Sequence, residues 1–297
     1  MSRSRAIEPA GRTRNPGAEP MSVVVVTDSS SRLPEDMRQQ WGIRQVPLHI
    51  LIDDRDLRDG VDRIPDNIHE CGGATTAAAT PAELRDAYQQ ALAASGGDGV
   101  VAVHLSAALS GTLRAAETTA AELGPSIRVI DSKSTAMNTG FVALAAARAA
   151  ADGSDLNTVA HAARAAVRRN YGFIVVHRLD NLRRSGRIGG AAAWLGSALA
   201  LKPLLRIDDG RLVLAQRART ASKALAAMID RVCDVIGDST AAVAVHHVAN
   251  EEGAAVLAAT LAERLPACPP AIVTDLGPVL ALHVGAGALA VCVEVPQ

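Results

Sequence analysis

The sequence predicts an α/β protein with an N-terminal parallel-sheet domain and a C-terminal α+β domain. In the first half of the 297-residue chain, short β-branched runs alternate with alanine-rich helical segments, which is the pattern of a parallel sheet with crossover helices. In the second half, a hairpin signal and closely spaced strands accompany two helices, which indicates an α+β arrangement. We therefore place the first domain at residues 22–169 and the second at residues 170–297.

Composition narrows the class of protein. Hydrophobic residues make up 48% of the chain but aromatic residues only 2%, so alanine, valine and leucine must fill the core. The charges of the 30 basic and 31 acidic residues nearly cancel. The protein as a whole therefore has no strong electrostatic field that would attract nucleic acid or an anionic membrane. The 4 cysteines have no CxxC spacing and are interpreted as small hydrophobic residues in a reducing cytosol. We expect a cytoplasmic protein without disulfides or a metal site.

Two segments lie outside this pattern. Residues 1–21 are rich in arginine, proline and glycine and contain no apolar run, which is typical of a disordered tail. Residues 191–201 form an alanine- and leucine-rich run, but a membrane span needs about 18 consecutive apolar residues. We therefore expect no integral membrane segment.

The elements of the first domain follow from local signals. Residues 23–26 are consecutive valines, which is typical of a buried parallel strand, and Pro47 suits an edge position in a second strand. A long loop then ends at Thr80, the expected N-cap of a helix with Pro81 at its first position. The expected strands are 23–26, 44–52, 101–105 and 127–130; the loop is 53–80; and helices open near residue 33 and cover 82–94, 113–123, 140–151 and 156–169.

Three strands of this domain end in small polar residues: Asp28-Ser29, Ser110-Gly111-Thr112 and Asp131-Ser132. The carboxyl ends of parallel strands lie at one edge of a sheet, where ligands bind, so these ends are expected to share a site. Ser110 and Thr112 precede a helix whose unpaired N–H groups attract a carboxylate or phosphate. In the alternative interpretation, both residues only cap that helix.

The second domain begins with a strand at 173–176 and a basic, glycine-rich segment at 179–190. Residues 208–210, Asp-Asp-Gly, form the expected turn of a β-hairpin. The other expected elements are hairpin strands 203–207 and 211–214, helices 221–236 and 253–265, and strands 242–248, 271–273, 279–283 and 288–295.

Taken in order, these segments resemble the DegV family of bacterial fatty-acid-binding proteins, over residues 23–295. The motifs that carry the resemblance are Val26-Thr27-Asp28-Ser29-Ser30, Thr76-Ala77-Ala78-Ala79-Thr80-Pro81, Leu109-Ser110-Gly111-Thr112, Ile130-Asp131-Ser132, Ser185-Gly186-Arg187-Ile188, Arg217-Ala218-Arg219-Thr220 and His283-Val284-Gly285-Ala286-Gly287. Two of them depart from the family pattern. Three alanines follow Thr76 in place of Ser-Gln-Pro, and Ala286 replaces a proline.

The resemblance implies a two-domain DegV-like fold with one long-chain fatty acid in a buried tunnel between the domains. It implies that Thr76 and Ser110 bind the lipid carboxylate, that Arg187 and His283 lie near the head group, and that Arg219 contacts a partner protein. In the fatty acid kinase system, the family member is the lipid-binding subunit. A separate dihydroxyacetone-kinase-like subunit brings ATP and magnesium and forms the acyl phosphate. The chain itself would then be no enzyme and would hold no cofactor.

The main alternative is a small-molecule transferase or hydrolase that uses Ser110 at an anion site. The sequence has no GxSxG elbow, P-loop, HExxH motif or complete glycine-rich nucleotide fingerprint, which favours the binding subunit. We interpret His246 and His247 as strand residues rather than metal ligands, and Thr112 as a helix cap. Asp28 and Asp131 are expected to organise the turns beside them.

Overall fold

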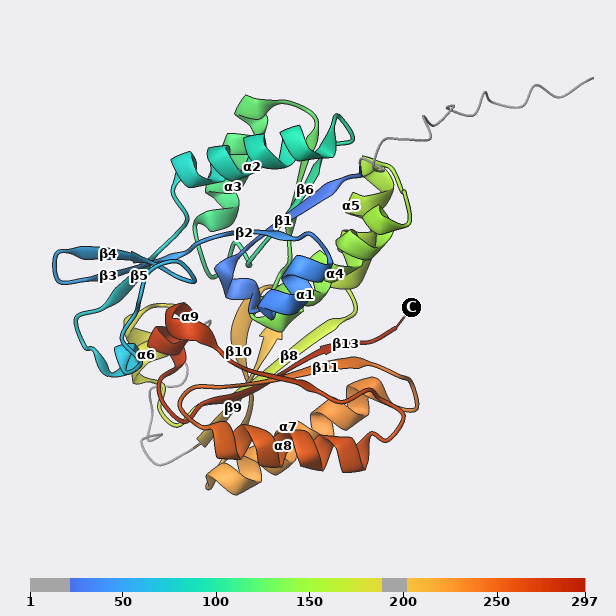
Figure 1. Ribbon diagram of the computed structural model, residues 1–297. Helices are drawn as coiled ribbons and strands as arrows, with labels where there is room; N and C mark the ends of the chain where they lie inside the picture. Colours follow the sequence, from blue (N-terminus) through green and yellow to red (C-terminus); the bar gives the residue numbers. More distant parts are fainter. Residues whose placement is uncertain (1–21, 189–201, 297) are drawn as a thin grey trace, which may run out of the picture.

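The computed structural model describes residues 22–188 and 202–296, and its first sheet is fully parallel (Figure 1). Its two central strands are rich in valine and largely buried, and their alternate side chains face opposite sides of the sheet. In spatial order the strands are β2 (Arg44–Val46), β1 (Val24–Asp28), β6 (Val100–His104) and β7 (Ile127–Asp131). Helices α2 (Pro81–Ser95) and α3 (Thr112–Leu123) pack on one face, and α4 (Met137–Ala151) and α5 (Leu156–Val167) on the other. The expected α/β fold is confirmed.

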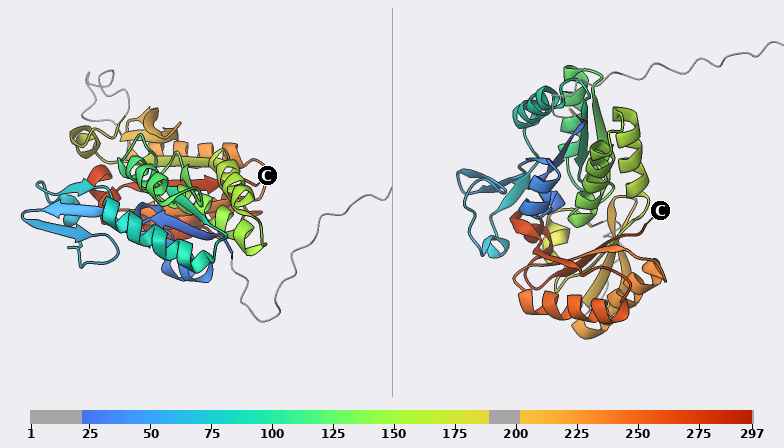
Figure 2. Two further views of the ribbon diagram at one scale, coloured as in Figure 1. Left: turned by 90° about the horizontal axis from the view of Figure 1, so that it is seen from above. Right: turned by 45° about the vertical axis from the view of Figure 1, so that its right-hand side comes forward.

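A second, mostly antiparallel sheet lies against α4. Its strands, in spatial order, are β10 (Arg211–Ala218), β9 (Lys202–Asp208), β8 (Asn170–Val175), β13 (Leu289–Glu294), β11 (Ala242–His247) and β12 (Ile272–Asp275). Helices α7 (Ala221–Ile236) and α8 (Glu251–Arg264) cover its outer face. Its inner face shares a hydrophobic core with α4, so the two sheets and their helices form successive layers (Figure 2).

A small third sheet projects beside these layers, with the order β4 (Arg55–Arg58), β3 (His49–Ile52), β5 (Thr75–Ala77). The ring of His49 anchors it, because its nitrogens lie 2.6 Å from Asp56 Oδ1 and 2.7 Å from Glu83 Oε2. Thr80 is the N-cap of α2, as predicted, and Glu83 completes a capping box with it.

Two predictions about the first domain are wrong. The single strand expected over 44–52 is two strands in different sheets, because the chain leaves the parallel sheet at Pro47, which has no N–H for a strand ladder. The loop expected over 53–80 contains β4, β5 and the short 3-10 helix η2 (Ile68–Glu70). The remaining short helices are η1 (Ser29–Ser31), α1 (Glu35–Gln40) and α6 (Asp180–Arg184).

The strand expected over 279–283 is also wrong, because these residues lie in helix α9 (Gly277–Val284). A short apolar run does not distinguish a helix from a strand by periodicity alone. Pro278 in the first turn and Gly285 at the end, with φ of 79°, are the helix signals. This helix carries His283, which lines the cavity described below.

We propose that the chain divides into two domains near residue 170, because the first and third sheets use only residues before it and the second sheet only residues from it onward. The expected tail at 1–21 and the apolar run at 191–201 lie outside the described residues. Within residues 22–188 and 202–296, no helix combines the length and apolar character that a membrane crossing needs.

Candidate functional site

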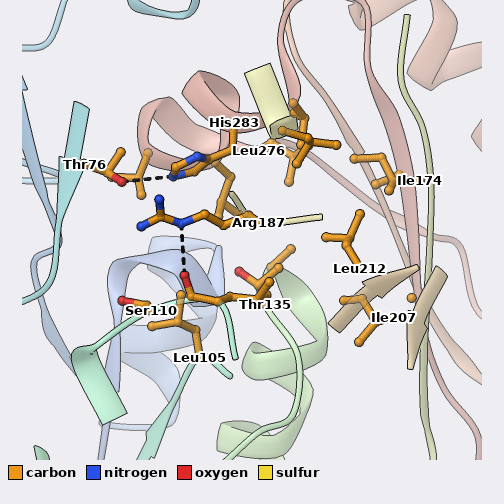
Figure 3. Close-up of a pocket in the computed structure, with 18 of the residues that line it drawn as sticks. Thr76, Leu105, Ser110, Thr135, Ile174, Arg187, Ile207, Leu212, Leu276 and His283 are labelled. Carbon is orange, nitrogen blue, oxygen red and sulfur yellow. Dashed lines mark hydrogen bonds between the residues drawn. The ribbon is translucent and has the colours of Figure 1, made fainter. Parts of the chain in front are cut away.

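A cavity lies where the carboxyl edge of the first sheet, the inner face of the second sheet and α9 meet (Figure 3). Most of its wall is apolar, including Leu105, Ile174, Ile207, Leu212, Leu276 and Leu280. The space open to the centres of water molecules is about 140 Å³. A mostly apolar cavity with a few convergent polar groups is the usual form of a small-molecule site.

Four of the five predicted site residues line this cavity: Thr76, Ser110, Arg187 and His283. They come from β5, the loop before α3, the segment after α6, and α9. Figure 3 shows Thr76 and His283 facing each other. In this view Arg187 lies between that pair on one side and Ser110 on the other. Arg219 lies elsewhere. It is exposed and directly follows β10. This end of β10 lies on the same side of the second sheet as the C-terminal end of β8.

The loop between β6 and α3 positions Ser110. Its amide donates to Ser106 O at 3.2 Å, and its hydroxyl oxygen accepts from the amide of Thr112 at 3.2 Å. The two hydroxyls of Ser110 and Thr112 are also hydrogen-bonded at 2.9 Å. The cap predicted at Thr112 is wrong, because the N-cap position is Gly111 and Thr112 is the first residue of α3.

Arg187 ties the second domain to this loop. Its Nε donates to Leu109 O at 3.3 Å, and its Nη1 donates to Ser185 O. No Asp or Glu is among the described residues that line the cavity, so Arg187 is their one permanent charge. A guanidinium at the end of an apolar cavity favours a ligand with an anionic head.

His283 is neutral at physiological pH. Burial lowers its pKa to about 4, and the nearby charge of Arg187 contributes in the same direction. Its Nε2 lies 2.9 Å from Thr76 Oγ1. Its Nδ1 is buried and has no hydrogen-bond partner within the described part of the chain. The ring therefore orients the Thr76 hydroxyl through Nε2.

A buried network that sequence analysis missed stiffens the start of the same loop. Asp28 Oδ2 accepts from the amide of Leu105 and lies 3.0 Å from His104 Nδ1, and His104 Nε2 lies 2.8 Å from the Tyr88 hydroxyl. Burial raises the pKa of Tyr88, so the phenol stays protonated. The sequence did contain a signal for this network, because Asp28 and His104 are the last residues of β1 and β6, which are neighbouring strands. Asp28 also accepts from Ser30 N, which confirms its predicted role in the turn.

His246 is a structural residue, as predicted. Its Nε2 accepts from the amide of Met137 at 3.3 Å, and its Nδ1 lies 3.0 Å from Thr274 Oγ1. Burial lowers its pKa to about 4. No group of three or more His, Cys, Asp or Glu side chains could hold a metal ion in residues 22–188 and 202–296.

The geometry gives no support to Ser110 as a nucleophile. A serine nucleophile needs a general base within hydrogen-bond reach. Among the described residues, the Ser110 hydroxyl contacts only the amide and hydroxyl of Thr112.

Fold and cavity together define a two-domain α/β protein with a mostly apolar cavity that also holds hydroxyl, imidazole and guanidinium groups. The chain belongs to the DegV family: the family described as "Uncharacterised protein, DegV family" matches residues 22–295. The DegV domain-containing protein Rv2417c of Mycobacterium tuberculosis is 71% identical over 275 residues, which are 93% of this chain and 98% of that protein.

Solved structures are similar over nearly the whole chain. One is a DegV family protein from Thermus thermophilus, described by its fatty acid binding, with a TM-score of 0.86 and 31% identity. Another is DegV from Bacillus subtilis, described as a fatty acid binding protein, with a TM-score of 0.84 and 27% identity. In both comparisons the match covers 93% of this chain and 100% of the other. The two-domain DegV fold expected from the sequence is confirmed.

Proposed function

We propose that this protein binds one long-chain fatty acid in the cavity and presents its carboxylate to a separate kinase subunit. The observation that carries the proposal is the distribution of chemistry in the cavity: apolar walls, hydroxyl, imidazole and guanidinium groups that converge, and no acid among its described residues. The fatty acid binding described for the Thermus and Bacillus relatives supports the same ligand class.

The apolar wall supplies the affinity for the acyl chain. Each methylene that leaves water contributes about 0.8 kcal/mol. Leu105, Ile174 and Leu212 are buried residues from three different strands or loops, so the chain is enclosed from both domains. The same enclosure hides the lipid from other proteins and membranes until a partner reaches its head.

The polar groups supply the recognition of the carboxylate. An isolated carboxylate is costly to bury, so it needs donors and a cation. Ser110 and Thr76 provide hydroxyl donors, and Arg187 provides the charge. For Thr76 to donate to the lipid, His283 must donate its Nε2–H to Thr76 Oγ1, which the neutral ring does as the Nε2–H tautomer.

The partner in this proposal is a dihydroxyacetone-kinase-like subunit that holds ATP and magnesium. A carboxylate oxygen of the bound lipid attacks the γ-phosphoryl group, ADP leaves, and an acyl phosphate forms. Four arginines are exposed, and an acidic surface on the kinase fits them: Arg183 and Arg184 on α6, Arg217 in β10 and Arg219 after it. In this scheme the chain works in the cytoplasm and is not itself the catalyst.

The test is lipid-dependent acyl phosphate formation with a candidate kinase subunit, ATP and magnesium. We expect His283→Ala to keep bound lipid but lose phosphorylation, because the ring lies at the head group. Arg219→Ala should raise the kinase concentration needed for half-maximal rate, and Arg164→Ala, an exposed arginine on α5, should not. Normal phosphorylation by the His283 variant would contradict the assigned role of the ring.

A further inference from the structure

Thr135 lies at the cavity, and its hydroxyl has no partner among the residues that the structure describes. Thr135 lies in the loop between β7 and α4 and lines the cavity. Its Oγ1 is buried and makes no hydrogen bond to any residue in 22–188 or 202–296. In Figure 3 it lies between Ser110 on one side and Leu212 and Ile207 on the other. The Thr135 hydroxyl, which can both donate and accept a hydrogen bond, therefore lies beside a part of the cavity wall that is otherwise apolar.

The neighbouring hydroxyls show that this placement is particular to Thr135. Ser132 Oγ is hydrogen-bonded to Thr139 Oγ1 at 2.9 Å. Ser134 Oγ is buried and, within the described residues, also lacks a partner, but Ser134 does not line the cavity. Of the loop's three hydroxyls, only that of Thr135 combines a free hydrogen-bonding group with access to a ligand.

The backbone around Thr135 is held from both sides. Ser134 O accepts from Ser106 N at 2.8 Å, and Met137 N donates to His246 Nε2 at 3.3 Å. Between them, Ala136 has φ of 54°, a conformation that a non-glycine residue keeps only where its surroundings impose it. The loop therefore presents Thr135 from a fixed position.

We propose that Thr135 is a specificity-determining residue that hydrogen-bonds an oxygen carried on the acyl chain, so that the protein's preferred ligands include hydroxylated long-chain fatty acids. This inference rests on the proposed function. A plain methylene beside Oγ1 leaves the hydroxyl unpaired, which is unfavourable, whereas a hydroxyl on the chain pairs with it. One positional isomer should fit, because the head group fixes the register of the chain.

The experiment measures binding of stearate and of each positional isomer of monohydroxystearate to the delipidated full-length chain. The variant is Thr135→Val, which keeps the shape and removes the hydroxyl. We expect at least one isomer to lose about threefold to tenfold in affinity with this variant, the range of a single hydrogen bond. Stearate should bind the variant as tightly as the wild type or more tightly.

Two further variants complete the design. Thr135→Ser keeps the hydroxyl and should keep the preference for the responding isomer, while Ser134→Ala removes the neighbouring free hydroxyl and should leave every affinity unchanged. Should Thr135→Val fail to fold, Thr135→Ala removes the same hydroxyl and takes its place. Thermal unfolding of each variant identifies the folded proteins.

The same data separate the two ways of failing. If the valine variant weakens stearate and all isomers equally, or if no isomer responds to it, the assignment of Thr135 is overturned while lipid binding stands. If the wild type binds neither stearate nor any isomer, the proposed function is overturned and this inference with it.

Discussion

His283 on α9 and Thr76 on β5 meet through a hydrogen bond of 2.9 Å between Nε2 and Oγ1, although 207 positions separate them in the sequence. The contact joins the end of the second domain to the small sheet that projects from the first. It also closes the polar end of the cavity, where Arg187 lies between the two domains. This end of the cavity is therefore complete only when residues from both halves of the chain have come together.

Ser110→Ala should weaken fatty acid binding by about tenfold to a hundredfold, because a hydrogen bond to a charged group contributes about 1.5–3 kcal/mol. Isothermal titration calorimetry with stearate measures the change. Ser222→Ala, which removes an exposed hydroxyl on α7, is the control and should bind as the wild type does. A change of less than about twofold in the Ser110 variant would remove this residue from the carboxylate site.

Acid should destabilise the protein through its two buried neutral histidines. The pKa of both His246 and His283 falls from 6.5 to about 4 on folding. Between these values the unfolded chain binds more protons than the folded chain, so the free energy of unfolding decreases as the pH falls through this window. Each histidine accounts for up to about 3 kcal/mol of the loss at the acid end.

Urea unfolding at a series of pH values tests this effect residue by residue. Glutamine keeps an acceptor at the Nε2 position in His246→Gln and a donor there in His283→Gln, and it does not titrate, so each variant should flatten the fall in stability between pH 6.5 and about 4. His161→Gln, at an exposed position on α5, should leave it unchanged. An equal slope in the wild type and both variants would show that protonation of these two rings does not cause the acid sensitivity.

Gly210→Ala should loosen the β9–β10 hairpin from the first domain. Gly210 has φ of 78°, and an added Cβ would collide with Ser106 Oγ. The adjacent Asp209 accepts a hydrogen bond at Oδ1 from Lys133 Nζ at 2.9 Å. This bond connects the tip of the hairpin to the loop that follows β7. Because Ile207 and Leu212 flank the tip and line the cavity, lipid affinity should fall together with stability.

The matched control for this prediction is Gly42→Ala. Gly42 has a similar φ of 60°, but an added Cβ would meet no atom within 4 Å. Both variants lose about 1–2 kcal/mol from the left-handed backbone, and only the Gly210 variant adds a collision. Thermal unfolding and stearate titration of the two variants separate these effects. Equal losses in both would show that the hairpin contact is unimportant.

Much of this arrangement could be predicted from the sequence, because several local signals agree with the fold. The valine run at 23–26, the Thr80-Pro81 helix start and the Asp-Asp-Gly hairpin turn all lie where predicted. The strand-end rule placed Ser110 at a cavity at the carboxyl edge of the sheet, but Asp28-Ser29 and Asp131-Ser132 do not line it, so the prediction that the three strand ends share this site is only partly right. The roles assigned to the site residues stay predictions until ligands are measured.

The parts that could not be predicted depend on long-range contacts or ambiguous short runs. Residues 279–283 are apolar in any conformation, and only Pro278 and Gly285 marked the helix. The Tyr88–His104 contact arises from packing between segments that no local pattern relates, and so does the burial of the Thr135 hydroxyl, which has no partner within the described part of the chain. Arg219 lies away from the cavity, so its role as a partner contact rests on its exposure and on the family resemblance.

The central claim is that one fatty acid occupies the cavity, and the most direct test is mass spectrometry of the organic extract released when the purified protein is gently denatured. We predict about one fatty acid per chain, and its mass gives the chain length, unsaturation and any added oxygen. An extract without lipid, together with no thermal stabilisation of the protein by added fatty acids, would contradict the claim.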